Sequence, residues 1–412
     1  MASGTGIKPR EYQTECVHSC LDSFMKGVNR MLVSLPTGSG KTVIFTLLLE
    51  EVPSPFPGAT KTLILVNREL QITQVHKYIS NCGSKLTVSV DQGKQYPDMD
   101  HDVIVASVQS LARDPSRLLK YNPKQFKCII TDEAHHATSA SYAKILQHFR
   151  VHEKNKSHIL LAGFTATAWR HDGVALNTVF DKIVFHRNFM EMIEGQWLCP
   201  LRIETVNTGT DLADVDKTGK DFQKEKLFEK INTPERNASV VNAYRAHCGY
   251  RRKATVVFAA DVKHSVAITE RFIKEGYDAH CITNYTNAKE RARLLQDFRD
   301  GKFSILVNCE MMTEGADFPM IDAIIIARPT KSTVLMVQML GRGVRLHPGK
   351  VDCLILDMVD TVDRKVFSII PVLLGLDPKV SSSIITSKLK LQSIMTGTRR
   401  NPNNCLWSYY VL

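Results

Sequence analysis

The segment Leu35-Pro-Thr-Gly-Ser-Gly-Lys-Thr42 constrains this chain most, because it joins a short apolar run to the start of an apolar helix. A glycine-rich turn into a helix N-terminus points backbone N–H groups at an anion, and the helix dipole adds to the attraction. Lys41 is then placed to reach β- and γ-phosphates, and the Thr42 hydroxyl to hold Mg²⁺. Leu35 replaces the first glycine of the usual GxxxxGK[ST] pattern. The residues that we predict to bind the nucleotide here are Pro36, Thr37, Gly38, Ser39, Gly40, Lys41 and Thr42.

A pair of carboxylates, Asp132 and Glu133, directly follows the apolar run Cys128–Thr131. The carboxyl end of a parallel strand is where such sheets bind ligands. Two adjacent carboxylates are costly there unless a cation is present. Mg²⁺ held by Asp132, with Glu133 orienting and deprotonating a water, explains both residues.

Two arginines close the segment Gln338-Met-Leu-Gly-Arg-Gly-Val-Arg345. Arg342 and Arg345 are three positions apart, so on a helix they share one face. Paired guanidinium groups suit the charge that develops on a transferred γ-phosphoryl group. We therefore predict that these two residues act in catalysis.

Short apolar runs alternate with helical patterns along most of the chain. The expected strands are 31–35, 62–66, 103–106, 128–131 and 159–164 in the first half, and 255–259, 278–283, 305–308, 323–327 and 353–356 in the second. Glu11–Phe24 and Glu69–Ile79 have helical patterns, and Asn287 with Glu290 marks a helix start. Uninterrupted apolar strands alternating with helices indicate parallel sheets covered on both faces, which is an α/β fold.

The domain organisation follows from this alternation. We expect an ATP-binding domain over residues 1–195, a charged connector over 196–253 and a second domain over 254–365. Residues 366–412 match no recognisable domain, and we leave them unassigned.

Charge, cysteine spacing and the length of the apolar runs indicate which kinds of partner and compartment to expect. Lys and Arg number 53 against 42 for Asp and Glu, a net charge of +11, which favours a polyanionic partner. The ten cysteines include no CxxC pair, so we expect free thiols in a reducing compartment. No apolar run reaches the roughly 18 residues that a membrane span needs, so we expect no membrane association.

Taken in order, these motifs resemble the core of superfamily 2 helicases over residues 7–360. The matching segments are Arg10–Gln13, Leu35–Thr42, Asn67–Leu70, Ser107–Leu111, Asp132–His135, Thr165–Thr167, Val256–Ala259, Val307–Asp317 and Gln338–Arg345. The resemblance implies two RecA-like parallel-sheet domains in tandem, with ATP and Mg²⁺ bound between them and nucleic acid running across both.

The resemblance also implies roles for residues that the local patterns do not assign. Adenine and further ATP contacts are implied for Arg10, Gln13, Gly315 and Asp317, and a catalytic role for Gln338. Nucleic-acid contacts, mainly to the phosphate backbone, are implied for Arg68, Ser107, Gln109, Arg170, Thr313 and Thr330. Coupling of hydrolysis to movement is implied for His135, Thr165 and Thr167.

Within that superfamily, the segment from Thr165 to Gly173 and the spelling of Gln338–Arg345 are similar to the Rad25-like and type III restriction (Res subunit) group, which carries a DEAH-type second motif. Leu306–Cys309, Thr313–Gly315 and Ala327–Ser332 are most similar to its fungal mitochondrial branch. The resemblance implies an ATP hydrolase that acts as a helicase or translocase on duplex or branched DNA, and we expect it to act as a monomer.

Three alternatives remain open at this point. The first is an RNA-directed ATPase of the same fold, and the second is a DNA-binding clamp without turnover. The third is the motor subunit of a restriction complex, for which no nuclease-type segment follows Arg345. Stimulation of ATP hydrolysis by duplex DNA against duplex RNA separates the first from our reading.

The resemblance places the protein in mitochondria, with nucleus or cytoplasm as the alternative. No Arg-rich amphipathic presequence precedes Arg10. We therefore expect that the chain is a helicase core lacking one or both native ends.

Overall fold

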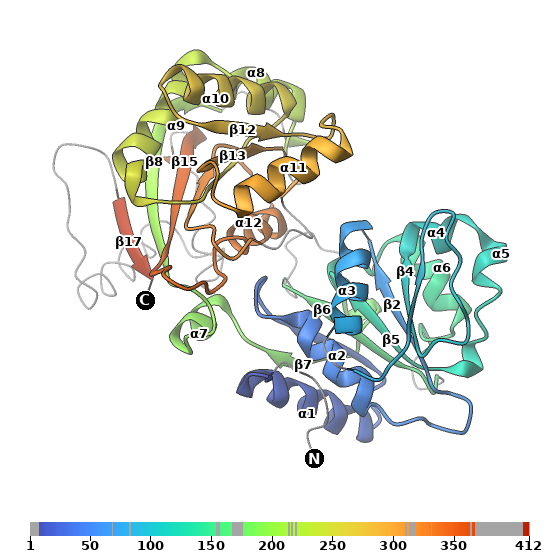
Figure 1. Ribbon diagram of the computed structural model, residues 1–412. Helices are drawn as coiled ribbons and strands as arrows, with labels where there is room; N and C mark the ends of the chain where they lie inside the picture. The colour runs from blue at the N-terminus through green and yellow to red at the C-terminus, as the bar shows by residue number, and fades with distance from the viewer. Residues whose placement is uncertain are drawn as a thin grey trace. The chain divides into compact units, whose positions relative to one another are not determined.

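The structure is a computed structural model that describes most of the chain. The described residues are 8–67, 69–81, 84–153, 157–166, 176–212, 215, 217–218, 221–309, 311–312, 318–330, 332–362, 365–366 and 407–411. They form two compact units divided between Arg187 and Asn188, with Thr37–Ser39 grouped with the second unit. Each unit has its own mainly parallel sheet with helices around it, which confirms the predicted α/β class (Figure 1). Within these residues, no helix combines the length and apolar character that crossing a membrane requires.

The first unit is built on a seven-stranded parallel sheet in the order β3-β4-β2-β5-β6-β1-β7. Its strands are β1 Arg30–Ser34, β2 Lys61–Val66, β3 Val88–Asp91, β4 Val103–Ser107, β5 Phe126–Asp132, β6 Leu160–Thr165 and β7 Lys182–His186. Its helices are α1 Glu11–Met25, α2 Lys41–Glu51, α3 Glu69–Asn81, α4 Val108–Arg113, α5 Pro115–Leu118 and α6 Ala140–His148.

Both faces of this sheet are covered, as the apolar strand runs predicted. Leu161 of β6 joins the core cluster that α4, α5 and α6 complete. Phe164 lies three residues further along β6, on the opposite face, and its ring centroid is 5.7 Å from that of Phe45 in α2. The sheet is therefore a buried layer, and its carboxyl edge is left to carry polar residues.

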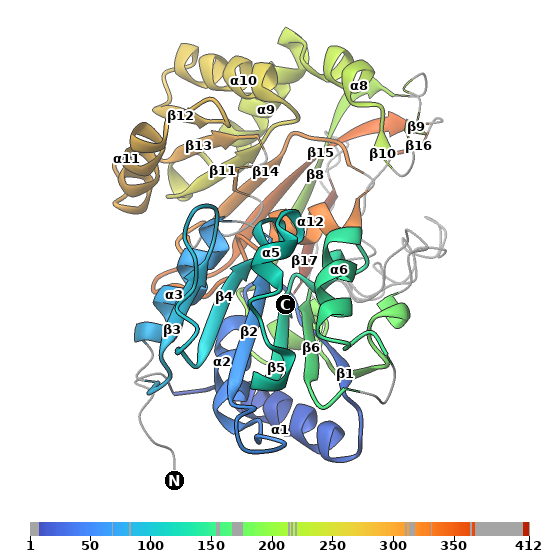
Figure 2. The same ribbon diagram turned by 90° about the vertical axis from the view of Figure 1, so that its right-hand side faces the viewer.

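The second unit has a sheet in the order β12-β13-β11-β14-β15-β8-β17, with β16 paired to the end of β15. Its strands are β8 Leu201–Asp211, β11 Thr255–Phe258, β12 Ala279–Ile282, β13 Ile305–Asn308, β14 Ala323–Ile326, β15 Cys353–Val362, β16 Lys365–Val366 and β17 Trp407–Val411, with a separate pair β9 Lys217–Thr218 and β10 Asp221–Phe222. Its helices are α7 Phe189–Glu194, α8 Lys224–Ile231, α9 Pro234–His247, α10 Val262–Lys274, α11 Ala288–Arg299 and α12 Thr333–Leu340. α9 and α10 bury their apolar faces against one side of this sheet, and Figure 2 shows both helices above its strands.

The segment that we expected to be a connector contributes to the second unit instead. β8 runs parallel beside β15, in register from Leu201 with Cys353 to Asn207 with Val359. α9 buries Val240, Val241 and Tyr244 in the core of the same unit. Beyond Val206, the side chains of β8 alternate between half-buried and exposed. The second half of this strand therefore lacks the continuous apolar run by which the other strands were predicted.

Local signals at several element ends match the sequence expectations. Asn287 is the N-cap of α11, and its side chain accepts a hydrogen bond from the Glu290 N–H at 2.8 Å. Leu294 and Phe298 are buried behind it.

The described cysteines are all free thiols, as expected from their spacing.

Candidate active site

The predicted phosphate loop connects β1 to α2 at the carboxyl edge of the first sheet. Gly38 has φ of 88° and Gly40 has φ of 74°, a left-handed region that glycine enters without steric cost. Gly40 is the N-cap of α2, whose first residues are Lys41 and Thr42. The Lys41 ammonium lies 3.3 Å from the Leu35 carbonyl and 3.4 Å from that of Pro36. Lys41 therefore curls over the loop, at the place where a phosphate would meet the helix N-terminus.

Gln13 lies directly beside this loop. A side-chain carbon built on Gly40 would come within 2.7 Å of Gln13 Nε2, so the two residues are in close approach. The Gln13 side-chain oxygen accepts the Arg10 N–H at 2.9 Å, which fixes the start of α1. The structure thus places Gln13 beside the loop and Arg10 next to Gln13, and the contact of both residues with adenine stays a prediction.

The carboxylate pair lies at the end of β5, two strands from the loop. β6 separates β5 from β1, and the register pairs Ser34 with Thr165 and Asp132 with Phe164. Glu133 has φ of 50°, and its N–H donates to Asp132 Oδ1 at 3.0 Å. A left-handed backbone at a non-glycine residue is costly and tends to occur at functional sites.

The electrostatics of this edge favour a cation. Burial, followed by the neighbouring Glu133 carboxylate, raises the pKa of Asp132 to about 6, whereas the Lys41 ammonium lowers it. Lys41 and Asp132 therefore act on each other across the sheet edge. Among the described residues, no group of three or more His, Cys, Asp and Glu side chains could hold a metal alone. A divalent ion at Asp132 would thus need further oxygen ligands, such as a hydroxyl and phosphates.

His135 and Thr165 connect the carboxylate pair to the neighbouring strand. His135 Nδ1 is 3.3 Å from Glu133 Oε2 and 3.4 Å from Thr165 Oγ1. The Thr165 carbonyl accepts the Leu35 N–H at 2.9 Å, at the start of the phosphate loop. A continuous polar chain thus runs from Glu133 to this loop. Such a chain is what a coupling role for His135 and Thr165 requires.

The arginine pair of the second unit follows α12. Our expectation that Arg342 and Arg345 share a helix face is wrong, because α12 ends at Leu340. Arg342 lies in a closing turn, where its N–H donates to the Met339 carbonyl at 3.2 Å, and Arg345 lies beyond that turn. Gly341 and Gly343 weaken the helix at this point. Gln338 remains within α12.

The candidate nucleic-acid residues divide by exposure. Ser107 is buried and caps α4, since its Oγ accepts the Ser110 N–H at 3.3 Å. Gln109 is exposed, and its amide oxygen accepts from Ser107 Oγ at 3.1 Å. Thr330 is buried after β14, and its hydroxyl accepts the Ser332 N–H at 3.0 Å. Gln109 is thus the most accessible of the three.

Six of the predicted site residues lie outside the described residues. They are Arg68, Thr167, Arg170, Thr313, Gly315 and Asp317.

Sequence reasoning missed two buried groups that hold site segments in the second unit. Arg236 is 1% exposed; it donates to both carboxylate oxygens of Asp360 and to the Ala327 carbonyl at 2.8 Å, three residues before Thr330. His264 Nδ1 accepts the Ala260 N–H at 3.3 Å at the end of β11, and its Nε2 lies 3.1 Å from Asn237 Oδ1. The Arg236–Asp360 pair spans 124 positions, so no local pattern could have revealed it.

Comparison with known proteins agrees with this arrangement. Residues 6–170 match the family described as "Type III restriction enzyme, res subunit", and residues 236–347 match the "Helicase conserved C-terminal domain". A Schizosaccharomyces pombe protein named as the mitochondrial ATP-dependent helicase irc3 is 42% identical over 372 residues, covering 90% of this chain and 61% of the relative. A Saccharomyces cerevisiae protein named as the ATP-dependent helicase IRC3 is 39% identical, covering 89% of this chain and 53% of the relative. The chain thus spans somewhat over half the length of these relatives.

A solved structure supports the fold. The ATP-dependent Type ISP restriction-modification enzyme LlaBIII, bound to DNA, is similar with a TM-score of 0.64 at 19% identity, covering 87% of this chain and 28% of the enzyme. The two family matches lie in the expected order along the chain, and the first contains the sheet edge that carries Lys41, Asp132 and Glu133. Residues 6–170 and 236–347 thus carry the two domains of a helicase core, and the chain is similar over most of its length to the fungal Irc3 helicases.

Proposed function

We propose that this protein is an ATP-dependent DNA helicase or translocase that couples hydrolysis of Mg-ATP to the remodelling of duplex or branched DNA. The observation that supports this best is the shared sheet edge, where Lys41 and the Asp132–Glu133 pair act on one another next to a glycine loop at a helix N-terminus. The named relatives are ATP-dependent helicases, which agrees with this chemistry.

The residues of this edge divide the work of hydrolysis. Backbone N–H groups of residues 37–42 and the Lys41 ammonium bind the β- and γ-phosphates, because they are the positive groups at the helix N-terminus. Glu133 orients the attacking water and accepts its proton, since a carboxylate next to the phosphate edge can do both. Arg342 and Arg345 stabilise the charge on the γ-phosphoryl group.

The donor set suits a magnesium ion. Mg²⁺ prefers one or two carboxylates with waters and substrate phosphates to a cage made only of protein ligands. Asp132 supplies the carboxylate and Thr42, in the first turn of α2, the hydroxyl. The neighbouring Glu133 carboxylate raises the pKa of Asp132, and a cation at this position would offset the repulsion between the two carboxylates, which fits this assignment. When bound, the ion neutralises phosphate charge.

DNA is the polymer that we propose, contacted through its phosphate backbone. The net charge of +11 favours a polyanion, and one structurally similar enzyme is bound to DNA. Gln109 is the exposed described residue among the predicted contacts. We also propose action in mitochondria, as one relative's name states for that protein, and action as a monomer.

The test is the steady-state ATPase rate of the protein with no polymer and with single-stranded, duplex, forked and four-way DNA, and with duplex RNA. We expect a requirement for Mg²⁺ and the largest stimulation by duplex or branched DNA. The Lys41→Ala variant controls for contaminating ATPases, and its rate should be at background. Stimulation by RNA alone would replace DNA with RNA as the substrate. DNA binding without turnover would favour the clamp.

Location has a separate measurement. Imaging of a C-terminally tagged protein expressed from its native transcript should show it in mitochondria. A nuclear or cytoplasmic signal would contradict that part of the proposal and leave the ATPase assignment untouched.

A further inference from the structure

The loop between α12 and β15 carries a lysine that binds the backbone of the arginine pair. Lys350 Nζ donates to the Gly343 carbonyl at 2.5 Å, the Arg345 carbonyl at 3.0 Å and the Pro319 carbonyl at 3.3 Å. An ammonium group has three N–H donors and no acceptor, so one side chain serves three carbonyls. Two of these carbonyls, those of Gly343 and Arg345, belong to the segment from Arg342 to Arg345.

A tight turn places this lysine. His347-Pro-Gly-Lys350 closes with a hydrogen bond from the Lys350 N–H to the His347 carbonyl at 3.1 Å. Gly349 has φ of 77°. Proline followed by a glycine with positive φ is the signature of a type II turn. The turn reverses the chain, so that the Lys350 side chain reaches back to the residues that precede it.

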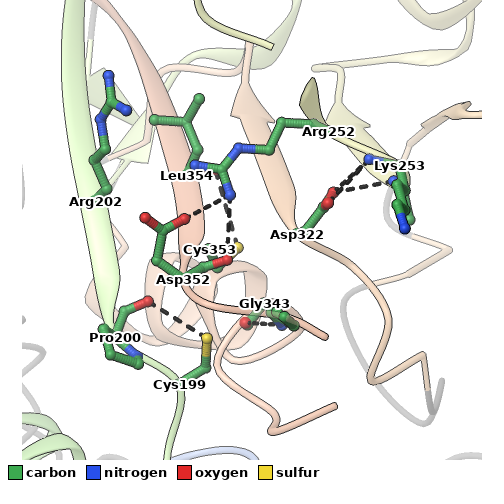
Figure 3. A network of polar contacts seen from close by, with 12 residues as sticks. Cys199, Pro200, Arg202, Arg252, Lys253, Asp322, Gly343, Asp352, Cys353 and Leu354 are labelled. Atoms are coloured by element: carbon green, nitrogen blue, oxygen red, sulfur yellow. Dashed lines mark hydrogen bonds and ion pairs between the residues drawn. The ribbon is translucent and has the colours of Figure 1, made fainter. Parts of the chain in front are cut away.

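The far end of the loop is anchored independently. Arg252 and Asp352 form an ion pair at 2.5 Å with side chains 14% and 21% exposed (Figure 3). The Cys353 N–H donates to the Pro200 carbonyl at 2.9 Å. These contacts fix the start of β15 against β11 and β8. Lys350 is two residues away from this anchor and is therefore held in place.

The arginine segment itself is held on every side. Between the two carbonyls bound by Lys350, the Val344 carbonyl accepts the Cys199 N–H at 2.7 Å. Three successive carbonyls, from 343 to 345, are thus hydrogen-bonded. Gly343 also packs so tightly that a side-chain carbon there would come within 2.3 Å of Cys353 Sγ. After the helix ends, these contacts replace the regular hydrogen bonds that a helix would have provided.

We infer that Lys350 is a positioning residue for ATP hydrolysis, acting through the backbone of Arg342 and Arg345. The inference rests on the proposed role of these arginines. Its physical basis is that α12 ends before Arg342, so the direction of both guanidinium groups depends on a non-helical backbone. A displacement of about 1 Å at a catalytic group can cost on the order of 10²-fold in rate.

The test compares Lys350→Met with wild type in the DNA-stimulated ATPase assay. We expect kcat to fall by roughly 10- to 100-fold, while the Kd for a fluorescent ATP analogue and the Tm stay near wild type. Lys350→Arg keeps the charge, but the planar guanidinium group cannot donate to three converging carbonyls at once, so we expect an intermediate kcat. Lys302→Met is the matched control, because Lys302 is an exposed lysine of the same unit whose side chain forms an ion pair with Asp297; its kcat should be unchanged.

A double-mutant cycle decides whether Lys350 acts through the arginines. In an Arg345→Ala background, adding Lys350→Met should lower kcat by much less than it does in wild type. Equal losses in both backgrounds would overturn the inference, as would an unchanged kcat for Lys350→Met. If both Lys350 variants lose their fold, the residue is structural for the whole unit and the inference also fails.

The failure of the proposed function would look different. A wild-type protein without ATPase activity would contradict the proposed function. An active wild type with an equally active Arg345→Ala variant would contradict the role of the arginines. A strongly reduced kcat for Arg345→Ala together with a wild-type kcat for Lys350→Met would contradict only the role of Lys350.

Discussion

Glu133 is the residue on which hydrolysis depends most sharply in this proposal. Its left-handed backbone and its contact with His135 hold the carboxylate at the end of β5. Replacing Glu133 with Gln keeps the side-chain volume but removes the proton acceptor. We expect the ATPase rate to fall by about 10²–10⁴-fold, which is the usual contribution of a general base, with ATP binding retained. The measurement pairs ATPase kinetics with equilibrium binding of an ATP analogue; a rate within a few-fold of wild type would remove Glu133 from this role.

At the scale of an element, the buried histidine of α10 leads to a prediction about how the stability of the protein depends on pH. Burial, with a smaller effect of Arg236, lowers the pKa of His264 to about 3. His264 is therefore neutral in the folded protein, whereas the unfolded chain binds a proton below its ordinary pKa of about 6.5. Protons thus favour unfolding between these two values, and this group makes stability fall by about 1.4 kcal/mol per pH unit as the pH decreases through that window.

Urea unfolding of the protein at pH 7.5, 6 and 5 tests this. The His264→Asn variant should lose stability at pH 7.5, because the hydrogen bond with the Ala260 N–H is altered, but it should show a shallower decline toward pH 5. An equally steep decline in both proteins would assign the pH dependence to other groups.

The contact of α9 with β15 leads to a second prediction at this scale, about the free energy of unfolding. Arg236 and Asp360 form a bidentate pair with side chains 1% and 2% exposed. Arg236→Met leaves a buried carboxylate without its partner, which typically costs about 3–5 kcal/mol. Adding Asp360→Leu should restore part of this loss, because the unpaired charge is then removed. Arg293→Met, at a pair that is 58% exposed on the arginine side, is the control and should have a much smaller effect in urea unfolding.

For the whole molecule, the net charge of +11 leads to a prediction about DNA affinity. Binding through phosphates releases counterions, so the logarithm of the affinity should fall linearly with the logarithm of the salt concentration, with a slope near −0.9 per phosphate neutralised. Affinities for unrelated duplexes should agree closely, and Arg68→Ala should weaken all of them while reducing the slope by about one. Titrations of labelled duplexes at several salt concentrations measure both quantities, and a strong preference for one base sequence would contradict backbone binding.

The domain boundaries also belong to the scale of the whole molecule. The charged composition of residues 196–253 suggested a connector, yet β8 and α9 build the second unit. Composition reports the exposed faces of these elements, whereas their place in a sheet depends on the partner strand β15, about 150 positions later. Pairing at such a distance leaves no mark on local composition.

Elements whose signals are local could be predicted from the sequence alone. These are the uninterrupted apolar strands, the glycine loop before α2, the acidic pair after β5 and the order of the motifs, because each depends on a few neighbouring residues and on strand or helix periodicity. The strand order, the position of Gln13 beside Gly40 and the end of α12 before Arg342 became known only from the folded structure. It alone also brought Lys350 to three carbonyls and Arg236 to Asp360. The physical reason is that packing brings the contacting segments together in space, so the energies of these contacts exist only once the sheets have formed.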